Sequence, residues 1–140
     1  MQIMVIDGQG GGMGRQLVSE IKAALPGVTV RAVGTNTAAT EAMRKAGADI
    51  TATGENAVLV GARKAQVIVG PVGMVIADAL HGEITPNMAQ AVGQSDATRI
   101  LIPVNQCENL IAGVENQSLG NLISSAIELM KEKMEQLSLL

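Results

Sequence analysis

The sequence contains no phenylalanine, tyrosine or tryptophan among its 140 residues, and it has only one cysteine and one histidine. Proteins that bind exposed nucleic-acid bases stack them on aromatic rings, so we expect no nucleic-acid partner. A lone Cys107 cannot form an internal disulfide framework, and we expect it to be an inert thiol. One histidine and one cysteine far apart in the sequence also provide no metal site.

Strong net charge and long hydrophobic runs are missing as well. The formal net charge is −3, and no apolar run approaches the ~20 residues that span a bilayer. The densest basic pairs, Arg44-Lys45 and Arg63-Lys64, come late in predicted helices, where they complement the helix dipole. With 47% apolar and 16% charged residues and no signal-peptide pattern, we expect residues 1–140 to form one cytoplasmic domain that has no membrane partner.

Short apolar runs alternate with helical patterns along the chain. Such alternation predicts a mainly parallel sheet with helices on both faces, a three-layer Rossmann-like fold of the α/β class with strand order 3-2-1-4-5. The predicted strands are 2–6, 28–33, 49–52, 66–69 and 99–104, with an antiparallel edge strand over 110–114. The predicted helices are 13–25, 38–46, 55–64, 72–80, 86–94 and a C-terminal helix over 119–137. Their predicted capping residues are Thr37, Thr53, Thr85 and Ser118.

The main chemical signal is a glycine-rich loop between the first strand and the first helix. Glycine lets the backbone adopt positive φ and approach a ligand without a Cβ, and a helix N-terminus presents free N–H groups to an anion. The loop therefore predicts a small phosphate-bearing ligand of the nucleotide type. The alternative is a turn that only packs strand against helix, which needs one or two glycines rather than five. The predicted ligand-binding residues of the loop are Gly8, Gln9, Gly10, Gly11, Gly12, Met13 and Gly14.

The end of the second predicted strand lacks the acidic residue that usually binds the ribose of NAD. Thr35 and Asn36 stand there instead, and they can bind a ribose or a 2′-phosphate without a carboxylate. This favours NADP or a mononucleotide over NAD. Gly70 and Pro71, after the fourth strand, are expected at the same edge of the sheet, and the segment 81–86 folds back toward them in this interpretation.

No convincing catalytic set is present. The weak candidates for proton transfer are His81, Glu83 and Asp78, with Glu55 as a further acidic residue. A histidine at a helix end is more often a complement to the helix dipole than a base. Asp7, beside the predicted anion site, has three open roles: it orients the loop, contacts a sugar or holds a metal. We expect the first.

The predicted C-terminal helix carries a wide apolar stripe, which is more than one face of a sheet requires. A second subunit is the simplest partner for the surplus, so we expect a homodimer, and the alternative is a helix lying fully on its own domain. The stripe consists of Ile123, Ile127, Met130, Met134 and Leu137, widened by Leu122, Ala126 and Leu129.

Several motifs together resemble a family of short bacterial proteins that is catalogued only as a domain of unknown function. The resemblance covers the whole chain and implies no established activity, substrate or cofactor. The glycine loop alone is similar to that of short-chain dehydrogenases, but only across the first strand–helix–strand unit, and their tyrosine–lysine proton relay is impossible without tyrosine. The motifs that carry the family resemblance are Val5–Gly14, Gly34–Asn36, Ala39-Thr40, Lys45–Ala48, Ala52–Ala57, Val69–Pro71 and Gly82–Pro86.

Three functional hypotheses remain open from the sequence. The first is a nucleotide-binding module, a sensor or regulator of NAD(P) or a related metabolite. The second is an oxidoreductase or other enzyme whose active site is completed across a dimer. The third is a structural interaction protein whose loop only packs.

Overall fold

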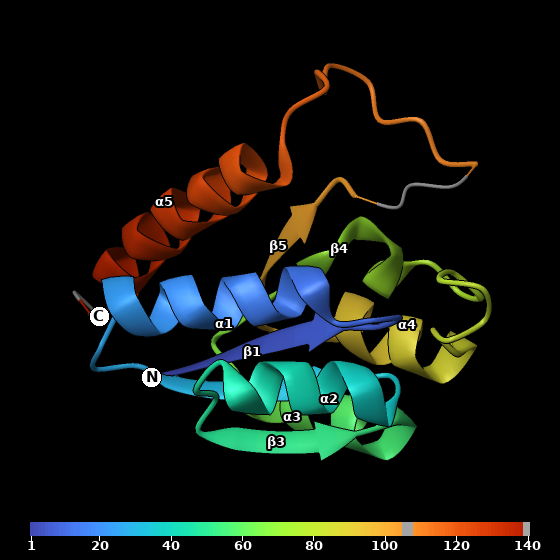
Figure 1. Cartoon of the computed structure of the whole chain (residues 1–140), viewed down its shortest axis with the longest axis horizontal. Helices are drawn as coiled ribbons and strands as arrows, with labels where there is room; N and C mark the ends of the chain where they lie inside the picture. The colour runs from blue at the N-terminus through green and yellow to red at the C-terminus, as the bar shows by residue number, and fades with distance from the viewer. Residues whose placement is uncertain (105–107, 139–140) are drawn as a thin grey trace.

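Five parallel strands form the centre of the molecule, in the order β3-β2-β1-β4-β5 (Figure 1). This computed structural model describes residues 1–104 and 108–138. The strands are β1 (Gln2–Asp7), β2 (Thr29–Gly34), β3 (Ile50–Thr53), β4 (Val67–Pro71) and β5 (Thr98–Ile102). The helices are α1 (Gly12–Ala24), α2 (Thr37–Lys45), α3 (Glu55–Lys64), α4 (Pro86–Gln94) and α5 (Leu119–Ser138), with a 3₁₀ turn η1 at Val72–Val75. The predicted three-layer α/β fold and its strand order are confirmed.

Both faces of the sheet are buried, and alternate side chains of β1 belong to two different cores. Ile3 and Val5 pack in a cluster with α1, α2 and α5. Met4 and Ile6 pack in a second cluster with α3 and α4. The central strands β1 and β4 are buried almost throughout, as expected for continuous apolar runs in a parallel sheet. In the absence of aromatic rings, the two cores consist of aliphatic side chains and methionine.

The predicted helix over 72–80 is wrong. The segment forms only η1 and then a series of turns, in which Asp78, Leu80 and His81 have φ of 68°, 56° and 57°. The Ile84 backbone donates a hydrogen bond to the carbonyl of Ala79 and accepts one from Asp78 N–H, and the second bond is not helical, because helical N–H groups donate to carbonyls that precede them. Leu80 and Ile84 are buried, as their apolar character predicts, but a folded loop rather than a helix buries them.

The predicted antiparallel strand over 110–114 is also wrong. Residues 108–118 contain turns and no strand, and the segment extends away from the sheet (Figure 1). Leu110 is 95% exposed, so the apolar residues of this segment do not form a buried edge strand of the sheet.

Two predicted helix caps are displaced by one residue. Asn36, not Thr37, caps α2, and its side chain accepts from Ala39 N–H. Gly54, not Thr53, is the N-cap of α3 and provides no side-chain cap, while the Thr53 hydroxyl forms a hydrogen bond with that of Thr40. The other two predictions are correct, since Thr85 accepts from Met88 N–H and Ser118 accepts from Asn121 N–H.

Gly70 is required by close packing at the end of β4. A Cβ there would lie 2.6 Å from the Ile6 carbonyl oxygen and 2.8 Å from Met74 Sδ. We expect Gly70→Ala to lower the free energy of unfolding by about 1–3 kcal/mol, because backbone must move to admit the methyl group. Urea unfolding measures this. The matched control is Gly93→Ala, at an exposed position of α4 where an added Cβ meets none of the described atoms within 4 Å. An equal loss of stability in both variants would contradict the packing argument.

Candidate functional site

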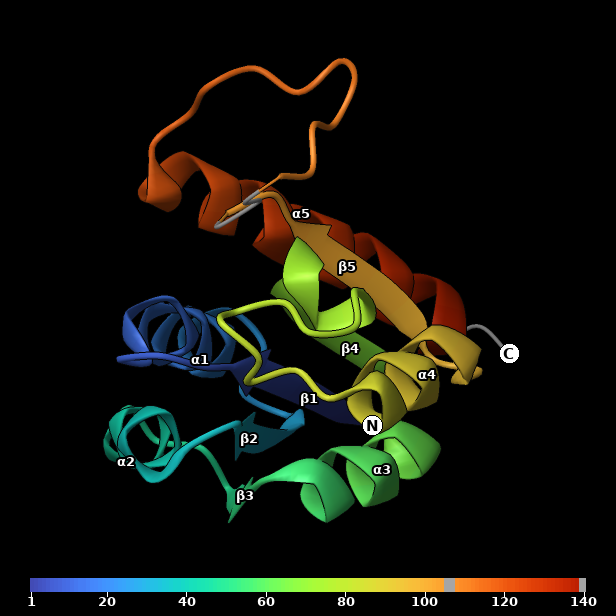
Figure 2. The same ribbon diagram turned by 90° about the vertical axis from the view of Figure 1, so that its right-hand side faces the viewer.

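The carboxyl ends of β1, β2 and β4 meet at one edge of the sheet, where β1 lies between its two neighbours. The chain passes from β1 through α1 to β2 on one side, and later returns through α3 to β4 on the other. Ligands of open α/β sheets bind at such a reversal of strand order, outside the carboxyl ends. Figure 2 looks onto this edge and shows the segment 76–85 crossing in front of β1 and β4.

Three of the five loop glycines are explained by the protein itself. Gly11 caps α1 with φ of 76°, a left-handed conformation that favours glycine. A Cβ on Gly8 would lie 2.6 Å from Thr35 Oγ1, and one on Gly14 would lie 2.6 Å from Met43 Sδ and 2.7 Å from Asp7 Cβ. The alternative in which the loop only packs strand against helix therefore explains three of the five glycines, rather than the one or two expected from the sequence.

Gly10 and Gly12 have no such explanation. Both are exposed, neither has positive φ, and a Cβ on either meets no atom of the described residues within 4 Å. Glycine carries a conformational entropy cost on folding, so its use at two open positions calls for another reason. Close approach of something outside the chain is such a reason.

The backbone amides of the loop divide into two groups. Gly8 and Gly14 donate to the two oxygens of the Asp7 carboxylate, at N···O distances of 2.8 and 2.7 Å, and Gly11 donates to the carbonyl of Gly8. The N–H groups of Gly10, Gly12 and Met13 find no acceptor among residues 1–104 and 108–138. Those of Gly12 and Met13 begin α1, where the helix dipole adds to their attraction for an anion.

Asp7 is the only charged side chain in the buried class among the described residues, with 7% of its surface exposed. Burial raises the pKa of this carboxyl, and the proximity of Glu83 adds to the rise, while the hydrogen bonds from Gly14 and Gly8 oppose it. These contacts show the role expected from the sequence, in which Asp7 orients the loop.

A second carboxylate joins three segments that are distant in the sequence. Glu83 Oε1 accepts from Thr35 Oγ1 at 2.6 Å, from Asn36 Nδ2 at 2.7 Å and from Gln9 N–H at 3.0 Å. Asn36 Nδ2 also donates to the Gln9 carbonyl at 2.9 Å. The hydrogen bonds lower the pKa of Glu83, and that from Thr35 has the largest effect. The sequence indicated that this end of β2 lacks a carboxylate, whereas the fold supplies one from elsewhere.

The segment that carries Glu83 is held in a defined conformation. Leu80 is 2% exposed, and its Cδ1 lies 3.1 Å from where a Gly8 Cβ would stand. Asp78, Leu80 and His81 all occupy left-handed backbone, which costs non-glycine residues about 1–2 kcal/mol each. Strained backbone of this kind persists only where surrounding contacts impose it, and it concentrates at ligand clamps and active sites.

The remaining predicted residues lie apart from this cluster or outside the described residues. Pro71 is buried at the end of β4, where it pairs with Ile102. His81 and Asp78 are exposed. Glu55 accepts from Thr85 Oγ1 and Asn87 Nδ2 rather than joining Glu83. Cys107 lies outside the described residues.

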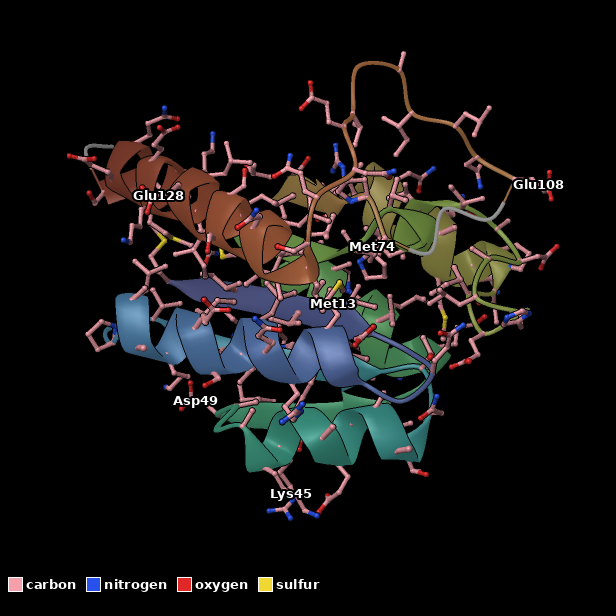
Figure 3. All side chains as sticks on the ribbon, turned by 45° about the horizontal axis from the view of Figure 1, so that its top comes forward. Met13, Lys45, Asp49, Met74, Glu108 and Glu128 are labelled. Carbon is pink, nitrogen blue, oxygen red and sulfur yellow. The ribbon has the colours of Figure 1, made fainter. Side chains whose placement is uncertain are left out.

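The side chains of other predicted groups point elsewhere. Met13 contributes only its backbone N–H to the loop surface, because its side chain lies between α1 and the neighbouring core, as Figure 3 shows. Lys45 projects from the C-terminal end of α2, away from the sheet, in the same view.

A hollow of about 710 Å³ opens at the amino edge of the sheet, opposite the loop, and is lined in part by Lys64, Asp96 and Lys133.

No group of three or more histidine, cysteine, aspartate or glutamate side chains in residues 1–104 and 108–138 is arranged to hold a metal ion. Within the same ranges, none of the helices has the length and apolar content needed to cross a membrane.

Comparison with known proteins places the chain in a family. Residues 2–135 match the family described as "Domain of unknown function (DUF3842)", and the chain belongs to it. None of the curated proteins matches the chain. Among solved structures, the chain is similar to the "dodecameric FMN-dependent Ubix-like Decarboxylase from Escherichia coli O157:H7", with a TM-score of 0.53 and 16% identity. The match covers 99% of this chain and 95% of that chain, and at this identity it shows the fold alone.

The Glu83 contacts predict a pH-dependent contribution to stability. A carboxyl whose pKa is lowered in the folded state stabilises that state above its ordinary value of 4.5, and this contribution is lost as the pH falls through the lowered pKa. We expect Glu83→Gln to reduce the free energy of unfolding by about 1–2 kcal/mol at pH 7. The difference from the wild type is smaller at pH 3 than at pH 7, because the wild-type carboxylate is increasingly protonated as the pH falls toward its lowered pKa. Urea unfolding at the two pH values measures this, and a difference independent of pH would contradict it.

Proposed function

We propose that this chain binds a nucleotide-type ligand through a phosphate group on the loop 8–14. The observation that carries the proposal is the pair of open glycines, Gly10 and Gly12, beside the unpaired amides of Gly10, Gly12 and Met13. A phosphate accepts hydrogen bonds from several amides at once, and a Cβ at either glycine would stand in its path. Gly8, Gly11 and Gly14 keep the loop in shape, and Asp7 fixes its two ends.

The nature of the ligand is part of the same proposal. The candidates are NAD, NADP and mononucleotides, and FMN joins them because the similar decarboxylase is described as FMN-dependent. Thr35 and Asn36 stand where the sugar of such a ligand reaches the end of β2. Since no catalytic set converges on the loop within residues 1–104 and 108–138, we propose a binding or sensing module of the cytoplasm rather than an enzyme.

The homodimer predicted from α5 remains a prediction, and the structure leaves little of the apolar stripe of α5 exposed for a second subunit. Ile123, Ile127, Met130 and Met134 are buried against the chain's own core, and only Leu129 of the stripe stays largely exposed, at 51%. Native mass spectrometry of freshly purified protein determines the number of subunits and shows any nucleotide that accompanies them.

Isothermal titration with AMP, FMN, NAD and NADP tests the proposed function. We expect at least one of them to bind the wild type, and Gly12→Val to lower its affinity at least tenfold, because the added side chain projects over the amides of the loop. Thermal unfolding confirms that the variant is folded.

Gly93→Val is the matched control, since Gly93 is also an exposed helical glycine with open space around it. It should bind as the wild type does. Equal affinity of Gly12→Val and Gly93→Val for the bound nucleotide would remove the loop from the site, and no binding of any of the four compounds would overturn the proposal.

A further inference from the structure

The Glu83 carboxylate has one oxygen engaged and one available. Oε1 accepts all three hydrogen bonds, from Thr35, Asn36 and Gln9, whereas Oε2 accepts none from the described residues. The side chain is only half-buried, so Oε2 is open to a partner from outside. The carboxylate also lies next to the loop, because one of its three donors is the backbone N–H of Gln9, which immediately precedes Gly10.

The contacts of the Glu83 carboxylate indicate that it is fixed in place and does not merely block the site until a ligand displaces it. Displacing the carboxylate would break three hydrogen bonds at once, two of them from side chains that are themselves anchored at the end of β2. Asn36 is held by its cap on α2 and by the Gln9 carbonyl. Within the segment 76–85, Asp78 N–H donates to the Ile84 carbonyl and Ile84 N–H donates to the Ala79 carbonyl, and these bonds enclose buried Leu80. The fold therefore presents Glu83 as part of the site wall.

The position of the carboxylate determines which part of a nucleotide it meets. With a phosphate at the first turn of α1, the attached sugar of a nucleotide lies toward the end of β2 in folds of this topology. A carboxylate oxygen there accepts hydrogen bonds from the adjacent 2′- and 3′-hydroxyl groups of a ribose. It repels a phosphate on the 2′ position, and the second negative charge of buried Asp7 nearby adds to that repulsion.

We propose that Glu83 selects nucleotides with free ribose hydroxyl groups and rejects those that carry a 2′-phosphate. This inference rests on the proposed nucleotide site and specifies its ligand class. It also reverses the preference for NADP that the sequence of the β2 end indicates, since the carboxylate absent from that strand is supplied 48 residues later, beside Thr35.

Three probes that differ only at the 2′ position test the inference: AMP, 2′-deoxy-AMP and adenosine 2′,5′-bisphosphate. We expect the wild type to bind AMP about tenfold more tightly than either of the others in isothermal titration. In Glu83→Gln, the affinity for the bisphosphate should rise about tenfold, because the repelling charge is gone, while the affinity for AMP falls. The ratio of the two affinities therefore moves by more than tenfold in favour of the bisphosphate.

Glu55→Gln is the matched control, because it removes one carboxylate from the same edge of the sheet without touching the Glu83 contacts. It should keep the wild-type order of affinities. If Glu83→Gln does not fold, Glu83→Asp replaces it, and we expect the shorter carboxylate to weaken discrimination between AMP and 2′-deoxy-AMP.

The outcomes separate this inference from the proposed function. If the wild type binds all three probes with equal affinity, Glu83 does not recognise the ribose hydroxyl groups and this inference is overturned, whereas the proposed nucleotide site is supported. If Glu83→Gln binds all three probes more tightly by the same factor, the Glu83 carboxylate competes with the ligand for the site, and the inference is overturned. If neither protein binds AMP, FMN, NAD or NADP, both proposals are overturned together.

Discussion

The buried carboxylate of Asp7 is the contact on which the shape of the glycine loop depends. Its two oxygens hold the amides of Gly8 and Gly14, the first and last residues of the loop, so the chain between them must close into a single turn. Burying an unpaired carboxylate is costly, and the raised pKa of Asp7 reflects that cost. The two amides and the positive end of α1 offset it, because each favours negative charge at this position.

This arrangement also limits where a phosphate can bind. Asp7 already engages one amide of the first turn of α1, that of Gly14, and its charge opposes a second anion on the inner side of the loop. The amides that remain belong to Gly10, Gly12 and Met13, and the two glycines among them are exposed. The phosphate of the proposed ligand is therefore expected on the outer side of the loop, where glycine at positions 10 and 12 leaves room for it.

Most of the architecture could be predicted because its elements follow local rules. Buried runs such as Ile3–Ile6 mark central strands, and Thr85-Pro86 marks a helix start whichever core the helix joins. The errors arose where apolar spacing was satisfied in another way. Leu80 is buried through a left-handed turn rather than a helix, and Leu110 is not buried at all. Local spacing does not distinguish these outcomes, because tertiary contacts decide them.

The site was predictable only in part, for the same reason. The position of the loop follows from its place between a buried strand and an amphipathic helix, but the division of its glycines into packing and open positions depends on Thr35, Ala39 and Met43. The sequence predicted that the segment 81–86 folds back toward the strand ends, which the Glu83 contacts confirm, but it did not single out Glu83 as the partner of Thr35, because the turns that position it begin in a stretch predicted to be helical, 72–80. The segment 76–85, which lies between η1 and α4 outside the regular helices and strands, carries this contact. A fold shared at 16% identity fixes neither ligand nor reaction, so any specificity depends on the side chains at the site, and Glu83 is the one that this segment brings to the loop.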